Sequence, residues 1–416
     1  MDNEISADGG QRLQRYLDSV GQLLGSDEAR SSFAVYSIGL LGAAERKSVE
    51  PIAALACPDP QRVDAAHQRL LHFLSNVPWS DHAVRLFAAR HAIAALTTQA
   101  PIESWIIDDT GLLKQGNHSV GVQRQYTGSA GKVTNCQVAV SLSVATRCGH
   151  TPVDIELYLP ERWANIKKRR KEARIPDDVV FRTKPDIALD IMRRAIADGI
   201  PLGVVLADAA YGNSAAWRVS VRQLGLHYAV GVDATTKVYR LDKKDRIACP
   251  ATDVRAIASI NAITKGSFHR VTWRQGTNHR LSARFSFQRV IPAHDDGTPK
   301  DDREVVWLIC EWRSGEQHPT KYHLVSLPSL PSMRETVRIL KERWRTERVY
   351  QDLKGEVGFD HFEGRRFTGW NHHVSVALSS FAFLVAERVA ASSTSIPPCA
   401  PLFTSTAHRH SLHVTP

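Results

Sequence analysis

The chain has 416 residues, of which 43% are hydrophobic and 23% charged, and its formal net charge is +10. These proportions are close to globular averages and exclude wholesale disorder and collagen-like repetition. At roughly 150 residues per domain, the length predicts two or three domains. The charge is uneven, because residues 1–100 carry −2 and the rest of the chain carries +12. We therefore expect a polyanionic partner on the body of the chain.

The cysteines and the apolar runs bear on the compartment. The six Cys residues are scattered without a CxxC pair, which argues against a structural zinc site and against a disulfide framework. No run approaches the ~18 apolar residues that a membrane span needs, and the acidic start at residues 1–4 is unlike a signal peptide. We expect a cytoplasmic protein in a reducing cytosol.

The first hundred residues have a helical pattern. Apolar residues recur at intervals of three and four from Leu13 to Leu24, which places them on one helix face. Asp59-Pro60 and Ser80-Asp81 have the form of helix starts, with a capping side chain before the first helical residue. We expect residues 1–100 to be an all-helical accessory or assembly domain without a catalytic cluster.

Residues 101–227 mix strand and helix patterns. Strands are predicted at 105–107, 138–144, 153–159 and 203–207, and helices at 185–199 and 213–224. The segment 153–159 alternates apolar and acidic residues, as a half-exposed strand would. Strands that come first and then alternate with helices indicate a mixed α/β sheet.

Residues 228–328 lose the helical pattern. Short β-branched or aromatic segments lie at 228–232, 268–274, 281–290, 304–312 and 321–327, which predicts a β-rich insertion. One long helix then begins at Ser332 and runs through Lys354, and a further apolar helix spans roughly 372–390. We expect residues 329–390 to complete the α/β core, and the Ser/Thr/Pro-rich residues 391–416 to be a disordered tail.

Three acidic positions stand out by their context. Asp109, with Asp108 beside it, ends one apolar run, Asp208 ends another, and Glu347 lies in the long helix. Carboxylates at the ends of buried strands lie where α/β sheets hold their active sites. An all-oxygen ligand set suits Mg²⁺ or Mn²⁺, and two such ions ~3.5–4 Å apart activate a nucleophile at a phosphodiester. The alternative for each Asp alone is a helix cap or a turn.

The long helix places charges of both signs on one face. Arg343, Glu347 and Lys354 fall within roughly 60° of one another at 100° per residue. A carboxylate flanked by two cations suits a metal ligand beside phosphate contacts. The alternative is a solvated helix with an ordinary i,i+4 ion pair.

Taken together, three segments resemble the signature regions of bacterial insertion-sequence transposases of the DDE superfamily, which have a ribonuclease-H-like fold. The segments are Ile107–Gly111, Ala207–Gly212 and Arg343–Lys354. The third follows the family pattern Tyr-x2-Arg-x3-Glu-x6-Lys except at its first position, where Leu340 stands in place of Tyr. Segments 47–51, 73–79 and 360–373 are also similar, so the resemblance covers about 30–388. It implies a ribonuclease-H-like mixed α/β core with a β-rich insertion and an N-terminal helical domain.

The resemblance also implies roles for the acidic residues. Asp109, Asp208 and Glu347 would hold two Mg²⁺ or Mn²⁺ ions, and the turn at Tyr211-Gly212 would aim Asp208. Asp108 competes with Asp109 for the first position. Because adjacent strand residues face opposite sides, only one of the pair points into the site. We favour Asp109.

Basic and aromatic residues are candidates for DNA contacts. The resemblance implies phosphate contacts for Arg343 and Lys354 and DNA contacts for Arg365 and Arg366. A basic run (Lys167, Lys168, Arg169, Arg170 and Lys171) is a candidate backbone contact, with a solvated helix face as the alternative. Aromatic rings in the insertion (Trp273, Trp307 and Trp312) are candidates for stacking on an unpaired base, with a packed β-core as the alternative.

The predicted function is a DNA transposase that performs metal-dependent cleavage and strand transfer at the ends of an insertion sequence. Its partner would be double-stranded DNA, both element ends and target, bound by a homodimer in a synaptic complex associated with the nucleoid. A second hypothesis is a catalytically inactive, transposase-derived DNA-binding protein or repressor. A third is a metal phosphohydrolase that acts on small substrates.

Overall fold

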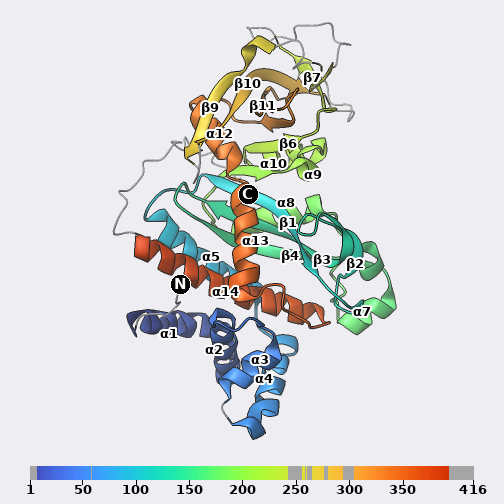
Figure 1. The fold of residues 1–416 in the computed structure, drawn as a ribbon. Helices are drawn as coiled ribbons and strands as arrows, with labels where there is room; N and C mark the ends of the chain where they lie inside the picture. The colour runs from blue at the N-terminus through green and yellow to red at the C-terminus, as the bar shows by residue number, and fades with distance from the viewer. Residues whose placement is uncertain are drawn as a thin grey trace, which may run out of the picture.

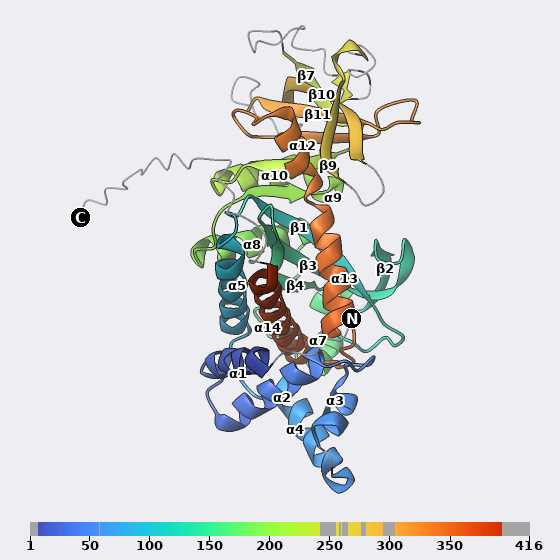
Figure 2. The ribbon, with the colours of Figure 1, turned by 60° about the vertical axis from the view of Figure 1, so that its left-hand side comes forward.

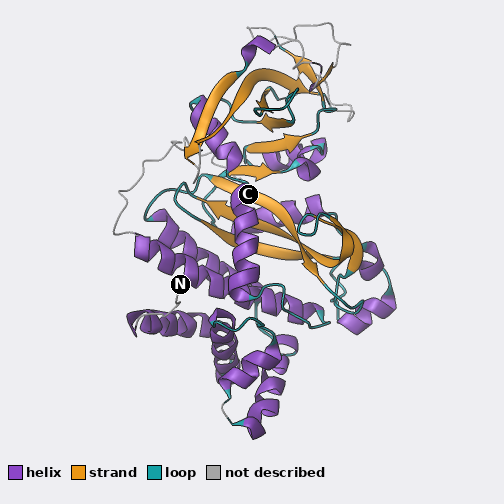
Figure 3. Cartoon of the chain, viewed as in Figure 1, coloured by secondary structure: helices purple, strands orange, loops and turns teal. Residues whose placement is uncertain are grey.

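The computed structural model describes residues 7–57, 59–241, 255–257, 259, 265–275, 280–293 and 304–392. Figures 1 and 2 show an elongated arrangement, with the N-terminal helices at one end, a sheet flanked by helices in the middle, and further strands at the other end. Figure 3 shows helices alone at the N-terminal end and strands in the other two parts. Of the predicted tail, residues 393–416 lie outside the described residues.

Helices make up the N-terminal part, as expected. They are α1 (Ala7–Gly21), α2 (Asp27–Leu41), α3 (Val49–Ala56), α4 (Val63–Ser75) and α5 (Asp81–Thr97). Both expected helix starts are confirmed. The Asp59 side chain accepts a hydrogen bond from the Gln61 N–H at the 3-10 turn Pro60–Arg62 that leads into α4. The Ser80 hydroxyl accepts one from the Ala83 N–H at the start of α5.

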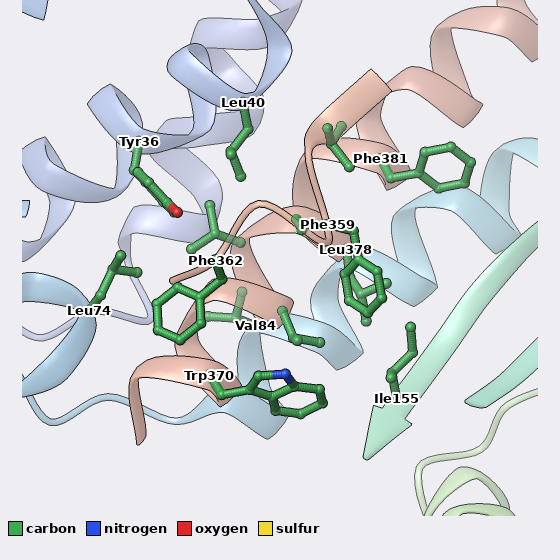
Figure 4. Close-up of a cluster of buried hydrophobic side chains, with 14 of the residues drawn as sticks. Tyr36, Leu40, Leu74, Val84, Ile155, Phe359, Phe362, Trp370, Leu378 and Phe381 are labelled. Carbon is green, nitrogen blue, oxygen red and sulfur yellow. The ribbon is translucent and has the colours of Figure 1, made fainter. Parts of the chain in front are cut away.

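The N-terminal helices share a hydrophobic core with the C-terminal helix α14 (Phe367–Ser392). Figure 4 shows side chains from the N-terminal helices, from the C-terminal part of the chain and from a central strand (Ile155) meeting in this core (Tyr36, Leu40, Leu74, Val84, Ile155, Phe359, Phe362, Trp370, Leu378 and Phe381). Full burial of a large apolar side chain contributes about 1.5–3 kcal/mol. The first hundred residues are thereby held to the last described helix.

Helix α14 is long and apolar enough, by length and composition, to cross a membrane. The expectation that no segment approaches this limit is therefore corrected. Its length as an apolar helix was not predicted from the sequence because polar residues interrupt the apolar run, among them His372, His373 and Ser375. Of its most apolar 18-residue window, 67% is buried inside the protein, against α5, α2 and β4. It is a core helix.

The central strands have a ribonuclease-H-like order. They are β1 (Ser104–Leu113), β3 (Lys132–Ala145), β4 (His150–Tyr158), β5 (Val204–Ala207) and β6 (Tyr228–Val232). Strand β3 pairs antiparallel with β1 and β4, whereas β5 pairs in parallel with β1 and β6. A further strand, β2 (Gln123–Thr127), pairs with the first residues of β3. The predicted α/β fold class is confirmed.

Helices cover both faces of this sheet. Between β4 and β6 the chain forms α6 (Glu161–Ala164), α7 (Lys167–Ala173), α8 (Lys184–Ala197), α9 (Ala209–Gly212) and α10 (Ala215–Gln223). Strand β4 is mostly buried, not half-exposed as expected. Its acidic residues are neutralised by arginines: Asp154 pairs with Arg85 of α5, and both Asp154 and Glu156 pair with Arg194 of α8.

The expected β-rich insertion continues the same sheet. Its strands are β7 (Lys237–Arg240), β8 (Arg255–Ala256), β9 (His269–Gln275), β10 (Arg280–Pro292), β11 (Val306–Trp312) and β12 (Lys321–Val325), with a 3-10 turn at Lys265–Ser267. Strand β12 pairs antiparallel with β6, with Leu324 opposite Val230. The described strands thus form one sheet in which β2 lies near one edge and β8 near the other.

The predicted long helix is divided into α12 (Met333–Lys341) and α13 (Trp344–Val357). The break has a tertiary cause. Helix α12 packs on the strands of the insertion, where Lys341 pairs with the fully buried carboxylate of Glu311. Helix α13 lies against β1, β4 and α14. At the break, Glu342 is buried and pairs with Arg338 and Arg345. The two helices are therefore separate because α12 packs on the insertion and α13 packs on the central sheet and α14.

A glycine in the turn after β5 sets a packing limit. A Cβ at Gly212 would lie 1.9 Å from the Gly231 carbonyl oxygen of β6, so the backbone would have to move. We expect Gly212→Ala to lower the free energy of unfolding by about 1–3 kcal/mol, measured by urea denaturation. Gly128→Ala is the control, because a Cβ there meets nothing within 4 Å. Equal stability of both variants would contradict this prediction.

A buried histidine predicts acid sensitivity. The His373 Nε2–H donates to the Phe359 carbonyl at 3.1 Å, so the neutral ring accepts at Nδ1 from the Tyr36 hydroxyl at 2.9 Å. Burial lowers the pKa of His373 to about 3. The unfolded chain binds this proton below pH ~6.5 and the folded chain does not, so stability falls as the pH decreases through that range. At pH 5 the loss from this group is about 2 kcal/mol.

The measurement is the free energy of unfolding as a function of pH from 7 to 5. We expect His373→Gln to reduce the slope by the binding of about one proton. The exposed His118, changed to Gln, serves as the control. A slope that is unchanged in His373→Gln would exclude this residue as a source of the pH dependence.

Candidate active site

The register of two parallel strands brings Asp108 and Asp208 together. Ile106 of β1 lies opposite Leu206 of β5. Asp108 and Asp208 each follow two residues later, close enough that the negative charge of Asp208 raises the pKa of Asp108. Paired residues of neighbouring strands point to the same face of a sheet. The Asp208 side chain also caps α9, since its Oδ1 accepts a hydrogen bond from the Ala210 N–H at 2.9 Å.

Buried neighbours identify the face on which each carboxylate lies. Ile106 and Leu206 belong to the apolar cluster that contains Val337 and Leu340 of α12. The residues between them and the acids, Ile107 and Ala207, belong instead to the cluster on the α8 side. Because strand residues alternate, Asp108 and Asp208 lie on the side of α12 and α13, and Asp109 lies on the α8 side.

Asp108 occupies a half-enclosed, charged position. Its side chain is 13% exposed, its Oδ2 lies 2.7 Å from Arg343 Nη1, and its Oδ1 accepts the Asp109 N–H at 2.8 Å. Burial raises the pKa of Asp108 to about 7, with the nearby negative charge of Asp208 acting in the same direction and Arg343 opposing it. Two carboxylates, Asp108 and Asp208, therefore lie near each other in a poorly solvated place with the guanidinium of Arg343 beside Asp108.

Asp109 has a different partner on the opposite face. Its Oδ2 lies 2.8 Å from Lys184 Nζ at the start of α8, and this ammonium also lies 5.9 Å from the ring centroid of Tyr158. The geometry therefore favours Asp108 over Asp109 as the partner of Asp208, the reverse of the preference drawn from the sequence.

Glu347 stands over the same face on α13. Its side chain is 64% exposed, and its Oε1 lies 3.8 Å from Arg343 Nη2. Arg343 thus bridges Asp108 and Glu347. Within the described residues, no three His, Cys, Asp or Glu side chains are already gathered as a metal-binding group. The ligand types and the shared face fit a hard divalent cation, provided that Arg343 turns away and Glu347 turns in.

Two side chains fix α13 against the sheet. The buried Tyr350 hydroxyl lies 2.6 Å from the Ser141 hydroxyl on β3, directly across from Asp108. Lys354 Nζ donates to the Gly111 carbonyl at 2.9 Å and to the Ser129 hydroxyl at 3.3 Å. The sequence analysis missed Tyr350, although its spacing of seven from Arg343 places it on the same helix face. These contacts fix the position of the Glu347 backbone relative to the strands.

The predicted DNA contacts are not gathered in one place. Lys167 and Lys168 are exposed on α7 at the far edge of the sheet. Arg170 already has hydrogen-bond partners within the protein, because its guanidinium donates to three backbone carbonyls, of Ala164, Pro176 and Val179.

Beside α14, Arg365 is exposed, whereas Arg366 donates to Asn76 Oδ1 at 2.7 Å. Like Arg343 and Lys354, the predicted DNA contacts Arg170 and Arg366 therefore already have protein partners.

The tryptophans of the insertion are partly packed. The ring of Trp312 lies under Arg284 and its Nε1–H donates to the Glu316 carbonyl, while Trp273 meets Phe285 edge-on. Trp307 lies under Arg289. Trp344, which the sequence analysis did not consider, is 38% exposed at the start of α13 with Arg274 4.5 Å from its ring centroid. It lies one helical turn from Glu347.

Comparison with known proteins places the chain in a family. The family described as DDE superfamily endonuclease matches residues 19–280, more than half of the chain. The chain belongs to this family. The match includes Asp108, Asp109 and Asp208 and ends before Glu347.

A curated relative agrees with this family. The chain is 32% identical over 203 residues to a protein of Microchaete diplosiphon named "Probable transposase for insertion sequence element IS701". The alignment covers 48% of this chain and 48% of that protein. The chain thus matches about half the length of this relative.

The two faces of β1 predict different metal behaviour for the acidic pair. A cation that binds only the folded state raises stability by about 2.7 kcal/mol at one hundred times its Kd. We expect the thermal stabilisation by Mg²⁺ to be lost in Asp108→Asn and kept in Asp109→Asn, measured as Tm against Mg²⁺ concentration at constant ionic strength. The opposite assignment would follow if Asp109→Asn alone lost the response.

Proposed function

We propose that this protein is a DNA transposase that cuts the ends of an insertion sequence and joins the released 3′-hydroxyls to target DNA. The observation that carries this proposal is the proximity of Asp108 to Asp208, with Arg343 linking Asp108 to Glu347 on α13. Membership of the DDE superfamily endonucleases and the likeness to a probable transposase support it.

Asp108, Asp208 and Glu347 are the residues that would hold divalent ions, two Mg²⁺ or Mn²⁺. When bound, such ions supply activation of a water or a 3′-hydroxyl and stabilisation of the leaving oxygen. The protein supplies position: Asp108 is fixed by the Asp109 amide, Asp208 by the α9 amide, and Glu347 by the packing of α13. No side-chain general base is required in this scheme.

The cations around the carboxylates would bind the DNA backbone. Arg343 has a planar fork that matches a phosphate as well as a carboxylate. In our proposal it leaves Asp108 for a phosphate of the bound strand, which frees the carboxylates for metal. Lys354, two helical turns beyond Glu347, would contact the next part of the same strand.

The larger organisation follows from the reaction. Because two element ends must be held for joining, we propose a homodimer on double-stranded DNA. Residues 1–100 would serve DNA binding or assembly, residues 101–227 and 329–390 would form the catalytic core, and residues 228–328 the insertion. The second hypothesis, an inactive DNA-binding derivative, predicts DNA binding without cleavage. The presence of all three acidic residues favours the active form.

Isosteric changes at the carboxylates separate cleavage from binding. We expect Asp208→Asn and Glu347→Gln to reduce cleavage of an element-end duplex in Mg²⁺ by at least ~10³-fold, a loss of about 4 kcal/mol in transition-state stabilisation, while DNA affinity changes little. Asp109→Asn, on the opposite face, is the matched control and should cleave.

The assay is gel analysis of labelled duplex with a parallel binding measurement. Cleavage that persists in either Asp208→Asn or Glu347→Gln would exclude the site of Asp108, Asp208 and Glu347 as the catalytic centre. Binding without cleavage in the unmodified protein would select the inactive DNA-binding derivative.

A further inference from the structure

A shallow basic pocket lies at the edge of the sheet, away from the carboxylates. It has a volume of about 460 Å³ and lies where β2, α6 and α7 meet, at the end of the sheet opposite the insertion in Figure 1. Its walls carry arginines and amides and no acidic side chain among the described lining residues (Asn117, Val122, Gln123, Arg124, Asn135, Arg162 and Arg169).

Three guanidinium groups converge here from three different elements. Arg124 comes from β2, Arg162 from α6 and Arg169 from α7. Within the part of the chain that the structure describes, none of the three forms an ion pair with a carboxylate. Elsewhere in this protein arginines are extensively paired, as Arg182 and Arg194 are with Glu156. Three unpaired cations in one hollow attract a polyanion.

The pocket is built on fixed side chains. Trp163 is 3% exposed, and its Nε1–H donates to the Val122 carbonyl at 2.8 Å, which ties α6 to the pocket wall. The guanidinium of Arg169 lies 4.7 Å from the Trp163 ring centroid. Asn135 is held by hydrogen bonds from its Nδ2 to the Lys114 and Gly116 carbonyls. A guanidinium that is stacked in advance loses less freedom when it binds a phosphate.

Strand β3 connects the pocket to the candidate active site. Asp108 lies opposite Ser141, and Arg124 lies opposite Asn135, six residues away along β3. Six residues of strand span roughly 20 Å. Since β3 alternates, Ser141 and Asn135 share a face, which is the face of Glu347. Between the two, Lys354 donates to the carbonyl of Gly111, which lies opposite Val138 of β3.

We propose that this pocket, formed by Arg124, Arg162 and Arg169, binds the sugar–phosphate backbone of the DNA whose end is processed at the carboxylates. At 3.4 Å per nucleotide of one strand, 20 Å corresponds to about six nucleotides from the scissile phosphate. The pocket is open, and its described walls offer guanidinium and amide groups without an aromatic lining residue to stack on a base. A continuous backbone suits it better than a free nucleotide. This inference rests on the proposed function.

The test combines salt dependence with mapping. Each lost phosphate contact weakens binding and reduces the slope of log K against log salt by about 1. We expect Arg124→Ala, Arg162→Ala and Arg169→Ala each to lower affinity several-fold for an element-end duplex, and the triple variant to reduce the slope by about 3. Phosphate-ethylation interference about six nucleotides from the cut should disappear in the triple variant.

Control variants guard against changes in charge and in folding. Arg193→Ala removes an arginine that is 53% exposed on α8, on the opposite face, and should leave the slope unchanged. Arg169→Lys keeps the charge if the loss of Trp163 stacking destabilises Arg169→Ala, as Tm will report. Arg124 projects from an edge strand, so Arg124→Ala gives a reading that does not depend on that stack.

The outcomes separate this inference from the function on which it rests. A triple variant with wild-type slope and interference pattern overturns the pocket while leaving cleavage by the unmodified protein in place. If the unmodified protein binds DNA but never cleaves it, and the triple variant loses the salt-sensitive part of that binding, the proposed function is overturned and the DNA-binding pocket is supported. Competition by inorganic pyrophosphate or thymidine monophosphate at micromolar concentration would overturn the backbone assignment in favour of a small ligand.

Discussion

The parallel pairing of β1 with β5 brings two carboxylates into one half-buried space, where their mutual repulsion requires a nearby cation. Asp108 and Asp208 share a face, and burial together with the charge of Asp208 raises the pKa of Asp108 to about 7. Like charges in a poorly solvated position are stable only with a cation nearby. Arg343 supplies one positive charge, 2.7 Å from Asp108 and 3.8 Å from Glu347. In our proposal, divalent ions balance the remaining carboxylate charge.

The need to deliver Arg343 and Glu347 to that space accounts for the arrangement of the C-terminal helices. A single straight helix from Ser332 to Lys354 could not follow both the insertion and the central sheet. The break at Glu342 lets α12 pack on the insertion, where the buried Glu311 is paired with Lys341, while α13 turns onto β1 and β4. The Tyr350–Ser141 contact then fixes α13 opposite Asp108. The insertion, which directly precedes these helices in the chain, thereby helps to set where the helix of Glu347 begins.

Much of this fold could be predicted from the sequence, because its signals are local. The caps at Asp59 and Ser80, the buried run before Asp208 and the short β-branched or aromatic segments of the insertion can each be recognised from a few consecutive residues. The choice between Asp108 and Asp109 is of another kind, since it depends on residues distant in sequence, Arg343 beside Asp108 and Lys184 beside Asp109. The exposure of β4 depends likewise on Arg85 and Arg194, which come from helices before and after it in the chain. No local pattern contains those partners.

The same distinction changes the meaning of the net charge. An excess of +12 over residues 101–416 suggests a broad basic surface, yet many of these cations neutralise internal acids or bond to backbone carbonyls. Arg170 holds a loop and Arg194 balances Asp154 and Glu156, so neither charge is available to a polyanion. What matters for DNA is where unpaired guanidinium groups converge. The pocket at the edge of β2 meets that condition, and β3 connects it to the carboxylates. Such a binding path can be inferred only when it is known which cations are paired with carboxylates or carbonyls. The net charge of the chain does not give this information.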